Sequence, residues 1–466
     1  MGAVALRKDA VHDPAAAERE LLARCERLVE RARALGADEA EACAAQWRSI
    51  TVRFEKGDLK LAQVDQGTTL GLRVFREGRL GFSSTNQSGD RALEAAAADA
   101  LALAKLAPPD AHNVLPDPRP VSAGAPLADA TVADLPIERA VEIGVGFLDR
   151  CRAGDARISI DSAGVDVTSV SRAIATSRGT RGAESDAMAS LNVFGMAIDG
   201  DDVGGFHYTG DSVRRLEDLE PVAEACAREF SSVALGNLGA RKAESYAGPV
   251  LFAPDAFLEV FVAPLVAGAS AIAVQRGRSA LAGKLGRPIG AGLLEVHDDP
   301  EDRSLSGAGA FDREGQPCRR YAIVEAGVLA GYLYNAYAAA VEGRVSTGHA
   351  AGTPRSVPGL GPHAVVVGPG NGGSRADLER ALGRGLYVQR FSGTVDAASG
   401  DFSGVAKSAR WVAGGAVAAP VRETLIAGNL FALLPRILAL SSVSERCSGE
   451  ARAPYALVDG VAVTAG

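Results

Sequence analysis

The chain has 466 residues, 47% of them hydrophobic and 23% charged, and its 49 Lys and Arg against 57 Asp and Glu give a formal net charge of −8. This composition is typical of a globular protein, and the length predicts about two to four domains with a large buried core. Basic residues are interspersed with acidic ones, so the chain lacks the positive field that binds phosphates. We therefore expect no direct contact with nucleic acid.

Three features bear on the location of the protein. The N-terminal stretch 1–16 is charged and has no long apolar segment of the kind that directs export. The most apolar stretch, residues 258–274, is interrupted by Glu259 and Pro264 and is too short for a membrane span. Six cysteines are scattered without a C-x-x-C pair, which indicates reduced thiols. We expect a cytoplasmic protein that does not bind membranes.

The first predicted element is an amphipathic helix over residues 14–35, which begins after Asp13 and ends at Gly36. Alternating segments separated by turn residues then predict an antiparallel meander. The expected strands are 47–55, 59–66, 68–76 and 79–84. An Ala-rich helix over 90–107 and a proline-rich stretch follow, and they predict that a first unit covers residues 1–115.

A second unit, residues 116–236, repeats this order. It is expected to contain a helix that begins near Pro136, four strands and a closing helix over 217–235. Its expected strands are 157–160, 164–176, 187–199 and 204–209.

The remaining residues, 237–466, predict a C-terminal domain with more strands than helices. A strand over 248–252 leads into an apolar helix over 254–267, and a later helix is expected over 375–382. The other expected strands are 292–296, 321–325, 327–335, 363–367, 385–390 and 408–412. Because the turns between strands are too short for crossover helices, the whole chain predicts an α+β fold with mainly antiparallel sheets and flanking helices.

An acidic run at residues 297–302 combines His297 with four carboxylates, which is a possible cation site. Pro300 prevents a helix that would gather these groups on one face, and no second histidine lies within motif spacing. We favour a solvated loop.

Residues 368–373 match G-x-G-x-x-G between an expected strand and an expected helix. A dinucleotide site would need an acidic residue after the next strand, but Arg390 stands there, and Pro369 removes a backbone N–H from the loop. We favour a plain loop here too.

Signs of hydrolytic chemistry are sparse. The chain has no G-x-S-x-G motif, and its six histidines are isolated in the sequence, without a helical pair and an adjacent Glu. Cys447 follows Arg446, a cation that can lower a thiol pKa, but a structural thiol is the more common case. His349 has glycines nearby that allow close backbone approach to a ligand, although a lone histidine in a loop is more often structural.

The order of several short segments resembles the TldD/PmbA family, also called modulators of DNA gyrase, and in particular its PmbA (TldE) branch. The likeness covers nearly the whole chain. The segments are 71–74 (Gly-Leu-Arg-Val), 81–85 (Gly-Phe-Ser-Ser-Thr), 248–254 (Gly-Pro-Val-Leu-Phe-Ala-Pro), 312–315 (Asp-Arg-Glu-Gly), 332–339 (Tyr-Leu-Tyr-Asn-Ala-Tyr-Ala-Ala), 347–349 (Thr-Gly-His), 400–403 (Gly-Asp-Phe-Ser) and 423–430 (Glu-Thr-Leu-Ile-Ala-Gly-Asn-Leu).

The resemblance implies a division of labour between two subunits. In this family TldD carries a H-E-x-x-x-H helix and a C-terminal Cys that bind the metal of a peptidase, and TldE lacks them. In this sequence the corresponding helix is 254–267, where Val262 and Ala267 stand at the histidine positions and Ala263 replaces the Glu. Aliphatic side chains cannot bind zinc, and Cys447, which matches the third position, makes a poor site alone.

We therefore expect the non-metal subunit of a TldD/TldE-type peptidase that degrades unfolded peptides or removes leader peptides. The resemblance implies no catalytic residue and no metal in this chain, zinc in a TldD-like partner, and a peptide chamber formed by both subunits. The expected chamber wall consists of Tyr334, Tyr337, His349, Asp401, Phe402 and Ser403. The alternatives are a stand-alone homodimeric peptide-binding protein, or a diverged peptide-modifying enzyme that uses His349, Asp401 or Cys447.

Overall fold

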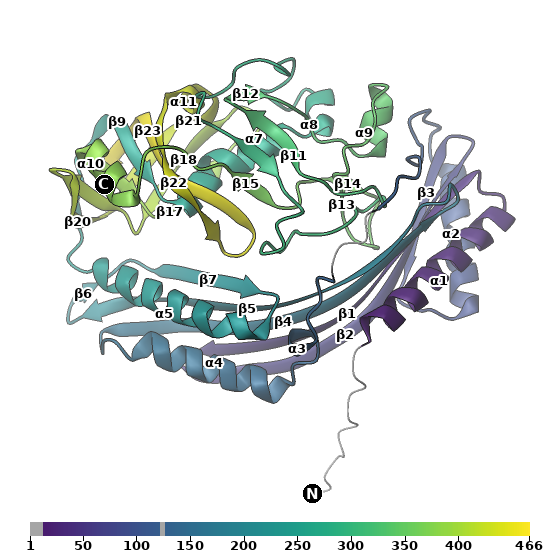
Figure 1. Ribbon diagram of the computed structural model, residues 1–466, viewed down its shortest axis with the longest axis horizontal. Helices are drawn as coiled ribbons and strands as arrows, with labels where there is room; N and C mark the ends of the chain where they lie inside the picture. Colours follow the sequence, from purple (N-terminus) through teal and green to yellow (C-terminus); the bar gives the residue numbers. More distant parts are fainter. Residues whose placement is uncertain (1–12, 122–125) are drawn as a thin grey trace, which may run out of the picture.

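The computed structural model describes residues 13–121 and 126–466. Residues 1–12, which include His12 and most of the stretch in which we expected no export signal, lie outside the described part. Within the described ranges, the structure contains no helix with the length and apolar character that a bilayer crossing requires. Figure 1 shows two layers, a long curved sheet with helices beneath it and a C-terminal domain above it.

The N-terminal sheet is antiparallel, and within the described residues it has seven strands in the order β3-β2-β1-β4-β5-β6, with β7 also paired to β5. The strands are β1 (Glu39–Glu55), β2 (Asp58–Arg76), β3 (Arg79–Thr85), β4 (Ile158–Thr176), β5 (Arg181–Asp199), β6 (Asp202–Val203) and β7 (His207–Val213).

Two expected breaks in this sheet do not occur. Residues 59–66 and 68–76 form the single strand β2, because Gly67 makes no turn and continues the pairing opposite Trp47. The Trp47 ring lies over Gly67, and a Cβ at that position would be 2.6 Å from Trp47 Cζ2. The expected strands 157–160 and 164–176 likewise form one strand, β4, which begins at Ile158.

The two N-terminal units share this sheet, because β1 pairs with β4 from Glu41↔Thr176 to Glu55↔Ser162. The units that we expected at 1–115 and 116–236 are therefore two halves of one sheet, each with its own apolar core under its own helices. The helices are α1 (Pro14–Ala34), α2 (Asp90–Leu106), α3 (Ala130–Ala133), α4 (Ile137–Arg152) and α5 (Leu219–Gly236), with the short turn η1 (Leu216–Asp218) before α5.

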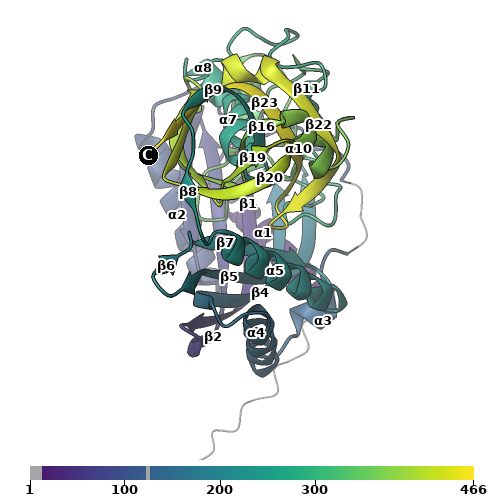
Figure 2. The same ribbon diagram turned by 90° about the vertical axis from the view of Figure 1, so that its left-hand side faces the viewer.

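Strand β5 shows how the sheet separates a core face from a polar face. Successive side chains of a strand point to opposite faces. Ala189 and Leu191 are buried in the core that also contains residues of α4 and α5, whereas Ser190 and Asn192 are half-buried on the other face. That second face is turned toward the C-terminal domain, as both views show (Figures 1 and 2).

The C-terminal domain is built on a second, mixed sheet. Within the described residues it has fourteen strands, and its longest path is β12-β11-β10-β15-β23-β9-β16-β19-β20-β8. Most pairs are antiparallel, and β9 pairs with β16 in parallel. The strands, including the separate pair β13–β14, are β8 (Arg241–Lys242), β9 (Tyr246–Phe252), β10 (Val296–Asp298), β11 (Tyr321–Glu325), β12 (Val328–Leu329), β13 (Ala350–Ala351), β14 (Gly359–Leu360), β15 (Val365–Val367), β16 (Arg384–Val388), β17 (Arg390–Val395), β18 (Asp401–Lys407), β19 (Arg410–Ala413), β20 (Ala416–Arg422), β21 (Thr424–Asn429), β22 (Ile437–Cys447) and β23 (Ala451–Ala465).

A helical segment fills the core of this domain. It consists of α6 (Pro254–Phe257), a π-helical turn η2 (Leu258–Val262) and α7 (Ala263–Gly268), in place of the single helix that we expected. Phe261 lies fully buried, with ring centroids 5.2 Å from Phe252 and 5.8 Å from Phe402. The smaller helices are α8 (Ala271–Gln275), α9 (Ala336–Val341), α10 (Arg375–Leu382), α11 (Leu430–Leu433) and the turn η3 (Leu434–Arg436).

Several expected C-terminal strands are shorter than predicted or shifted. The region 292–296 contributes only Val296 to β10, and 327–335 contains only the two-residue strand β12. The sequence prediction also missed the long antiparallel pair β22–β23. Strand β22 has three serines and β23 has five alanines, so neither shows the regular hydrophobic alternation by which a half-buried strand is recognised.

A buried charge network joins the two layers. Arg73 on β2 lies 2.6 Å from Glu41 on β1 and 3.0 Å from Glu314 in the C-terminal domain, and Arg313 lies 2.8 Å from Glu41. The four side chains are between 0% and 6% exposed. We call Glu41, Arg73, Arg313 and Glu314 the interdomain charge network.

Candidate functional site

The segment Pro254–Gly268 is where the family resemblance would place a peptidase metal. Val262 is 1% exposed and belongs to the apolar core, while Ala263 and Ala267 are exposed. Thus the two positions compared with histidines differ in burial, and none of the three side chains carries a nitrogen, oxygen or sulfur atom. The segment does not fit a zinc ion of the kind that the resemblance assigns to TldD.

Charged side chains nevertheless gather at this segment. Arg390 lies 3.5 Å from Glu259, and its guanidinium also donates to the carbonyl of Tyr208 on β7, at 3.0 Å. Burial raises the pKa of Glu259, and burial likewise raises the pKa of Asp255 at the start of α6. Arg390 therefore connects the helical segment of the C-terminal domain to the N-terminal sheet.

His207 and Glu229 lie on the N-terminal side of this junction. Glu229 Oε1 is 3.3 Å from His207 Nε2, and Glu229 Oε2 accepts a hydrogen bond from Thr209, at 2.6 Å. Burial by itself would raise the pKa of Glu229, but the contacts with His207 and Thr209 outweigh it and lower the pKa. His207 and Thr209 belong to β7 and Glu229 to α5, so these contacts fix the helix against the strand.

Cys447 is a buried, neutral thiol. It is 5% exposed, and burial, followed by the nearby Asp255 carboxylate, raises its pKa. The neighbouring Arg446 does not activate it, because Arg446 forms an ion pair with Asp211 on β7. The guanidinium that could lower the thiol pKa is therefore paired with a carboxylate, and the thiol is not activated as a nucleophile.

An open groove of about 520 Å³ lies between the N-terminal sheet and the C-terminal domain. We call it the sheet groove. Strands β4, β5 and β7 form its floor, and the turn between β22 and β23 contributes Ser448 and Glu450. Most of its lining residues are of polar type, among them Asp166, Thr168, Asp186, Ser190, Asn192, Asp211 and Ser212, and Val170, Met188, Leu191 and Tyr208 add apolar surface.

The sheet groove continues toward a second cavity. Val170 on β4 lines both the groove and a cavity of about 400 Å³. This second cavity is more apolar, with Trp47, Phe311 and Arg355 in its wall, and Arg355 lies over the Trp47 ring at 5.7 Å. The polar face of the sheet therefore carries two neighbouring hollows under the C-terminal domain.

Arginines pair with the acidic floor of the sheet groove. Asp166 lies 2.7 Å from Arg53, and Asp186 lies 2.8 Å from Arg214. Asp211 is held by Arg446, as described above. Because an arginine neutralises each of these three carboxylates, they give the groove little net negative charge. They remain as hydrogen-bonding groups held in fixed positions.

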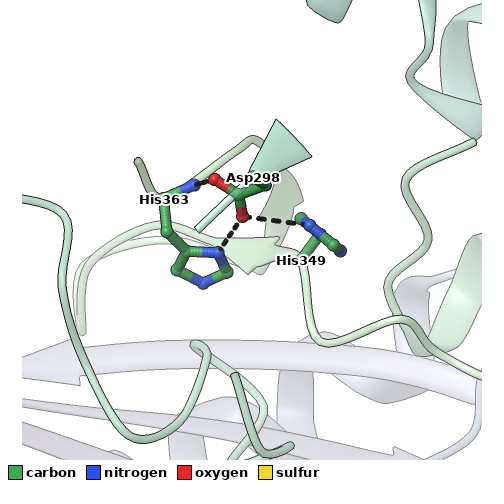
Figure 3. A group of neighbouring side chains, drawn as sticks. All are labelled: Asp298, His349 and His363. Carbon is green, nitrogen blue, oxygen red and sulfur yellow. Dashed lines mark hydrogen bonds and ion pairs between the residues drawn. The ribbon is translucent and has the colours of Figure 1, made fainter. Parts of the chain in front are cut away.

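A third constellation lies inside the C-terminal domain and was not predicted. Asp298 Oδ2 is 2.7 Å from His363 Nδ1 and 3.1 Å from His349 Nε2 (Figure 3). Asp298 and His349 are fully buried, and the His363 side chain is 15% exposed. We call Asp298, His349 and His363 the Asp298 cluster. The sequence prediction treated these histidines as isolated, because no motif spacing links residues that lie 14 and 51 positions apart.

The structure divides the six residues of the expected chamber wall into two groups. Tyr334, Tyr337 and His349 lie near α9, where the hydroxyl of Thr347 contacts both the Tyr334 carbonyl and His349. Asp401, Phe402 and Ser403 lie on β18. Within the described residues, none of the six lines the sheet groove.

The six residues also differ in exposure. Tyr334, His349 and Phe402 are buried, at 3%, 1% and 3% exposed, and Tyr337 is half-buried with its hydroxyl bonded to Asp110. Asp401 and Ser403 are exposed. The family-like sequence fragments thus indicated segments of the fold, but they did not indicate which side chains are exposed.

The glycine-rich segment 368–373 is a structural loop. The backbone N–H groups of Gly370 and Gly372 donate to the carbonyls of Ser441 and Leu440 on β22. These donors are therefore unavailable to a phosphate group. The loop then leads into α10, which begins with a capping box between Ser374 and Asp377.

Two parts of the chain match family models. Residues 245–465 match the PmbA/TldA metallopeptidase C-terminal domain, and residues 40–104 match PmbA/TldA metallopeptidase domain 1. The metalloprotease PmbA homolog of Haemophilus influenzae is 28% identical over 440 residues, which cover 93% of this chain and 94% of the relative. Metalloprotease PmbA of Escherichia coli O157:H7 is 27% identical over 398 residues, which cover 84% of this chain and 85% of the relative.

Among solved structures, TldE from Thermococcus kodakarensis has the same fold, with a TM-score of 0.86 at 23% identity over 95% of this chain and 100% of that chain. The expected mixed fold with mainly antiparallel sheets is thereby confirmed. Sequence matches in both the N-terminal sheet and the C-terminal domain, together with this fold, lead to one conclusion: the chain belongs to the PmbA/TldD metallopeptidase family.

Proposed function

We propose that this chain is the non-metal, TldE-like subunit of a TldD/TldE-type peptidase, and that it holds an extended peptide while a TldD-like partner supplies zinc and the hydrolytic water. One observation carries the proposal. The family resemblance assigns a metal-binding helix to the segment Pro254–Gly268, but in this chain Val262, Ala263 and Ala267 provide no ligand atom.

The sheet groove supports the peptide-holding role. Strand β7 pairs with β5 and with no other strand among the described residues, and its residues Tyr208, Gly210, Asp211 and Ser212 line the groove. Arg390 binds one backbone carbonyl of this strand, that of Tyr208, and the edge of β7 away from β5 pairs with no strand in the described part of the chain. An extended peptide can bind such an edge through main-chain hydrogen bonds, which are independent of the peptide sequence. Polar side chains of the groove can form hydrogen bonds with the amides of a peptide backbone. The peptide must be unfolded, because only an extended backbone can pair with a strand edge.

The expected wall residues enter this proposal unequally. Asp401 and Ser403 are exposed on β18 and remain candidates for contact with a peptide or with the partner. Tyr334, His349 and Phe402 are buried, so their side chains offer no exposed surface to a peptide in this chain. The proposal includes a cytoplasmic location, in keeping with the reduced state of all six cysteines, which lie in the described part of the chain as free thiols.

Reconstitution with a partner tests the proposal directly. The chain would be co-expressed with a TldD-type protein that has an intact H-E-x-x-x-H helix, and the complex would be analysed by mass photometry and by cleavage of an unfolded peptide. We expect a hetero-oligomer that cleaves the peptide, and no cleavage by this chain alone. A stable homodimer that ignores the partner would support the stand-alone binding protein instead, and cleavage by the isolated chain would support a diverged enzyme.

A bulky side chain in the sheet groove tests where the peptide binds. We expect Ser190→Trp to reduce the kcat/KM of the reconstituted complex by about tenfold or more, equal to roughly 1.4 kcal/mol of lost binding, because the indole fills the groove floor. Ala98→Trp on the exposed face of α2 is the matched control and should leave activity unchanged. Equal activities of the two variants, with equal assembly, would place the peptide elsewhere.

A further inference from the structure

The Asp298 cluster places three potential ligand atoms within 4.8 Å of one another. Asp298 lies on β10, His349 in the loop before β13, and His363 in the loop before β15, so three distant segments converge here (Figure 3). Two imidazoles and one carboxylate form a frequent ligand set for zinc and related divalent metals. We propose that the Asp298 cluster is a Zn²⁺ site of this chain, separate from the peptidase metal that the partner would carry.

Each of the three side chains is oriented by a contact on its other polar atom. His349 Nδ1 lies 2.8 Å from the hydroxyl of Thr347, and His363 Nε2 lies 3.2 Å from Cys318 Sγ. Asp298 Oδ1 accepts hydrogen bonds from the backbone N–H groups of His363 and Ala364, at 2.8 and 2.6 Å. Outer contacts of this kind orient metal ligands in proteins. Cys318 contacts the ring edge opposite Nδ1, so it orients His363 and does not bind the same ion.

The Nε2 atom of His349 is the clearest sign of a missing ligand. It is buried, and among the described residues it has no hydrogen-bond partner of acceptable geometry, although Asp298 Oδ2 lies 3.1 Å away. Buried polar atoms are nearly always satisfied, and an exception calls for a water or an ion.

The charge at the cluster also favours a cation. The Asp298 carboxylate is fully buried, and its Oδ2 atom faces both imidazoles. No lysine or arginine in the described ranges forms an ion pair with Asp298. A second buried carboxylate, Asp312, accepts a hydrogen bond from the N–H of Ala350, the residue after His349. A buried negative charge without a cationic partner is costly, and a divalent ion would remove that cost.

The site would stabilise the junction of the two layers. A bound ion would tie together β10, the loop that carries His349 and the segment before β15. Asp312, bonded to that loop, begins the turn that contains Arg313 and Glu314 of the interdomain charge network. Three protein ligands leave a fourth position of a tetrahedral zinc for water. Because the cluster uses none of the residues 254–268, failure of this proposal would leave the proposed peptidase role untouched.

Metal binding to the full chain tests the site. The purified protein would be stripped with a chelator, dialysed, and titrated with Zn²⁺ in competition with a chromophoric chelator; Co²⁺ would then be used as a spectroscopic probe. We expect stoichiometric zinc and a visible Co²⁺ absorption band in the native chain. His349→Ala and His363→Gln should lose both. Thr347→Val, which removes only an orienting contact, should weaken zinc binding by about 10- to 100-fold.

A neighbouring histidine supplies the control. His297 precedes Asp298 on β10 and is half-buried on the opposite side of the strand, so His297→Ala should bind zinc as the native chain does. Circular dichroism would verify folding, and His363→Gln serves if His349→Ala does not fold, since the His363 side chain is partly exposed. Absence of stoichiometric zinc from the native chain, or equal binding by His363→Gln, would overturn the proposal.

Discussion

The guanidinium of Arg73 lies 3.0 Å from the carboxylate of Glu314, 241 residues further along the chain. Arg73 belongs to the long strand β2 of the N-terminal sheet, whereas Glu314 belongs to the Asp-Arg-Glu-Gly turn of the C-terminal domain. The same guanidinium also contacts Glu41, and both carboxylates are fully buried. One arginine therefore holds two carboxylates from different layers, which makes it the central residue of the interdomain charge network.

Removing Arg73 should destabilise the protein strongly. Arg73→Ala leaves Glu41 and Glu314 buried without their shared cation, and breaking a buried ion pair from one side costs roughly 3–5 kcal/mol. Arg139→Ala is the matched control, since Arg139 and Glu142 form an exposed pair on α4. Urea unfolding of both variants measures the difference. Similar free energies of unfolding for the two variants would show that the network contributes nothing to stability.

The stability of the protein should depend on the charge of Glu314. The buried junction contains three carboxylates, Glu41, Asp312 and Glu314, against two guanidiniums, Arg73 and Arg313. Burial raises the pKa of Glu314 from 4.5 to about 7. The folded state therefore binds more protons than the unfolded state between about pH 4.5 and 7, so this carboxyl makes the free energy of unfolding fall as the pH rises through that window.

Glu314→Gln tests this pH dependence. The amide keeps the shape of the side chain and cannot lose a proton, so the variant should gain stability relative to the native chain as the pH rises from 5 to about 8. Melting temperatures across this range measure the difference between the two proteins. A difference that stays constant with pH would assign the extra proton to another group.

Gly71 should tolerate no side chain. A Cβ at this position of β2 would lie 2.0 Å from the carbonyl oxygen of Pro354, so Gly71→Ala would push the sheet away from the loop of the C-terminal domain. Overpacking of this kind costs roughly 1–3 kcal/mol. Gly154→Ala is the control, because in the described structure no atom lies within 4 Å of a Cβ there. Thermal unfolding should separate the two variants, and equal melting temperatures would contradict the close approach.

The cysteine thiols should be unreactive in the folded protein. All six are buried, and burial raises the pKa of each thiol above its ordinary value. We expect almost no reaction with Ellman's reagent at pH 7.5 and full reaction in guanidinium chloride, since the thiolate is the reactive form. Rapid labelling of Cys447 in the native state, located by mass spectrometry, would show that its surroundings do favour a thiolate.

Local sequence patterns predicted the elements whose start, apolar periodicity and end can all be recognised in one stretch of sequence. The Asp13 cap, the apolar period of 3.6 residues and Gly36 predicted a helix over 14–35, and α1 spans Pro14–Ala34. Strand β1 was predicted from residue 47, but it begins at Glu39, because its first residues are mainly Ala and Glu, which are depleted in strands. Strands without a clear alternation of polar and apolar residues, such as β22 and β23, could not be identified in this way.

The sequence by itself determined that no imidazole stands in the segment 254–268, because that fact needs only residue identities. Only the tertiary structure decided that His349 and His363 meet at Asp298, and that Arg73 reaches Glu314. The physical reason is the range of the interactions involved. Caps and periodicity act over a few residues, whereas the pairing of distant strands and the packing of one layer on another depend on the whole folded chain.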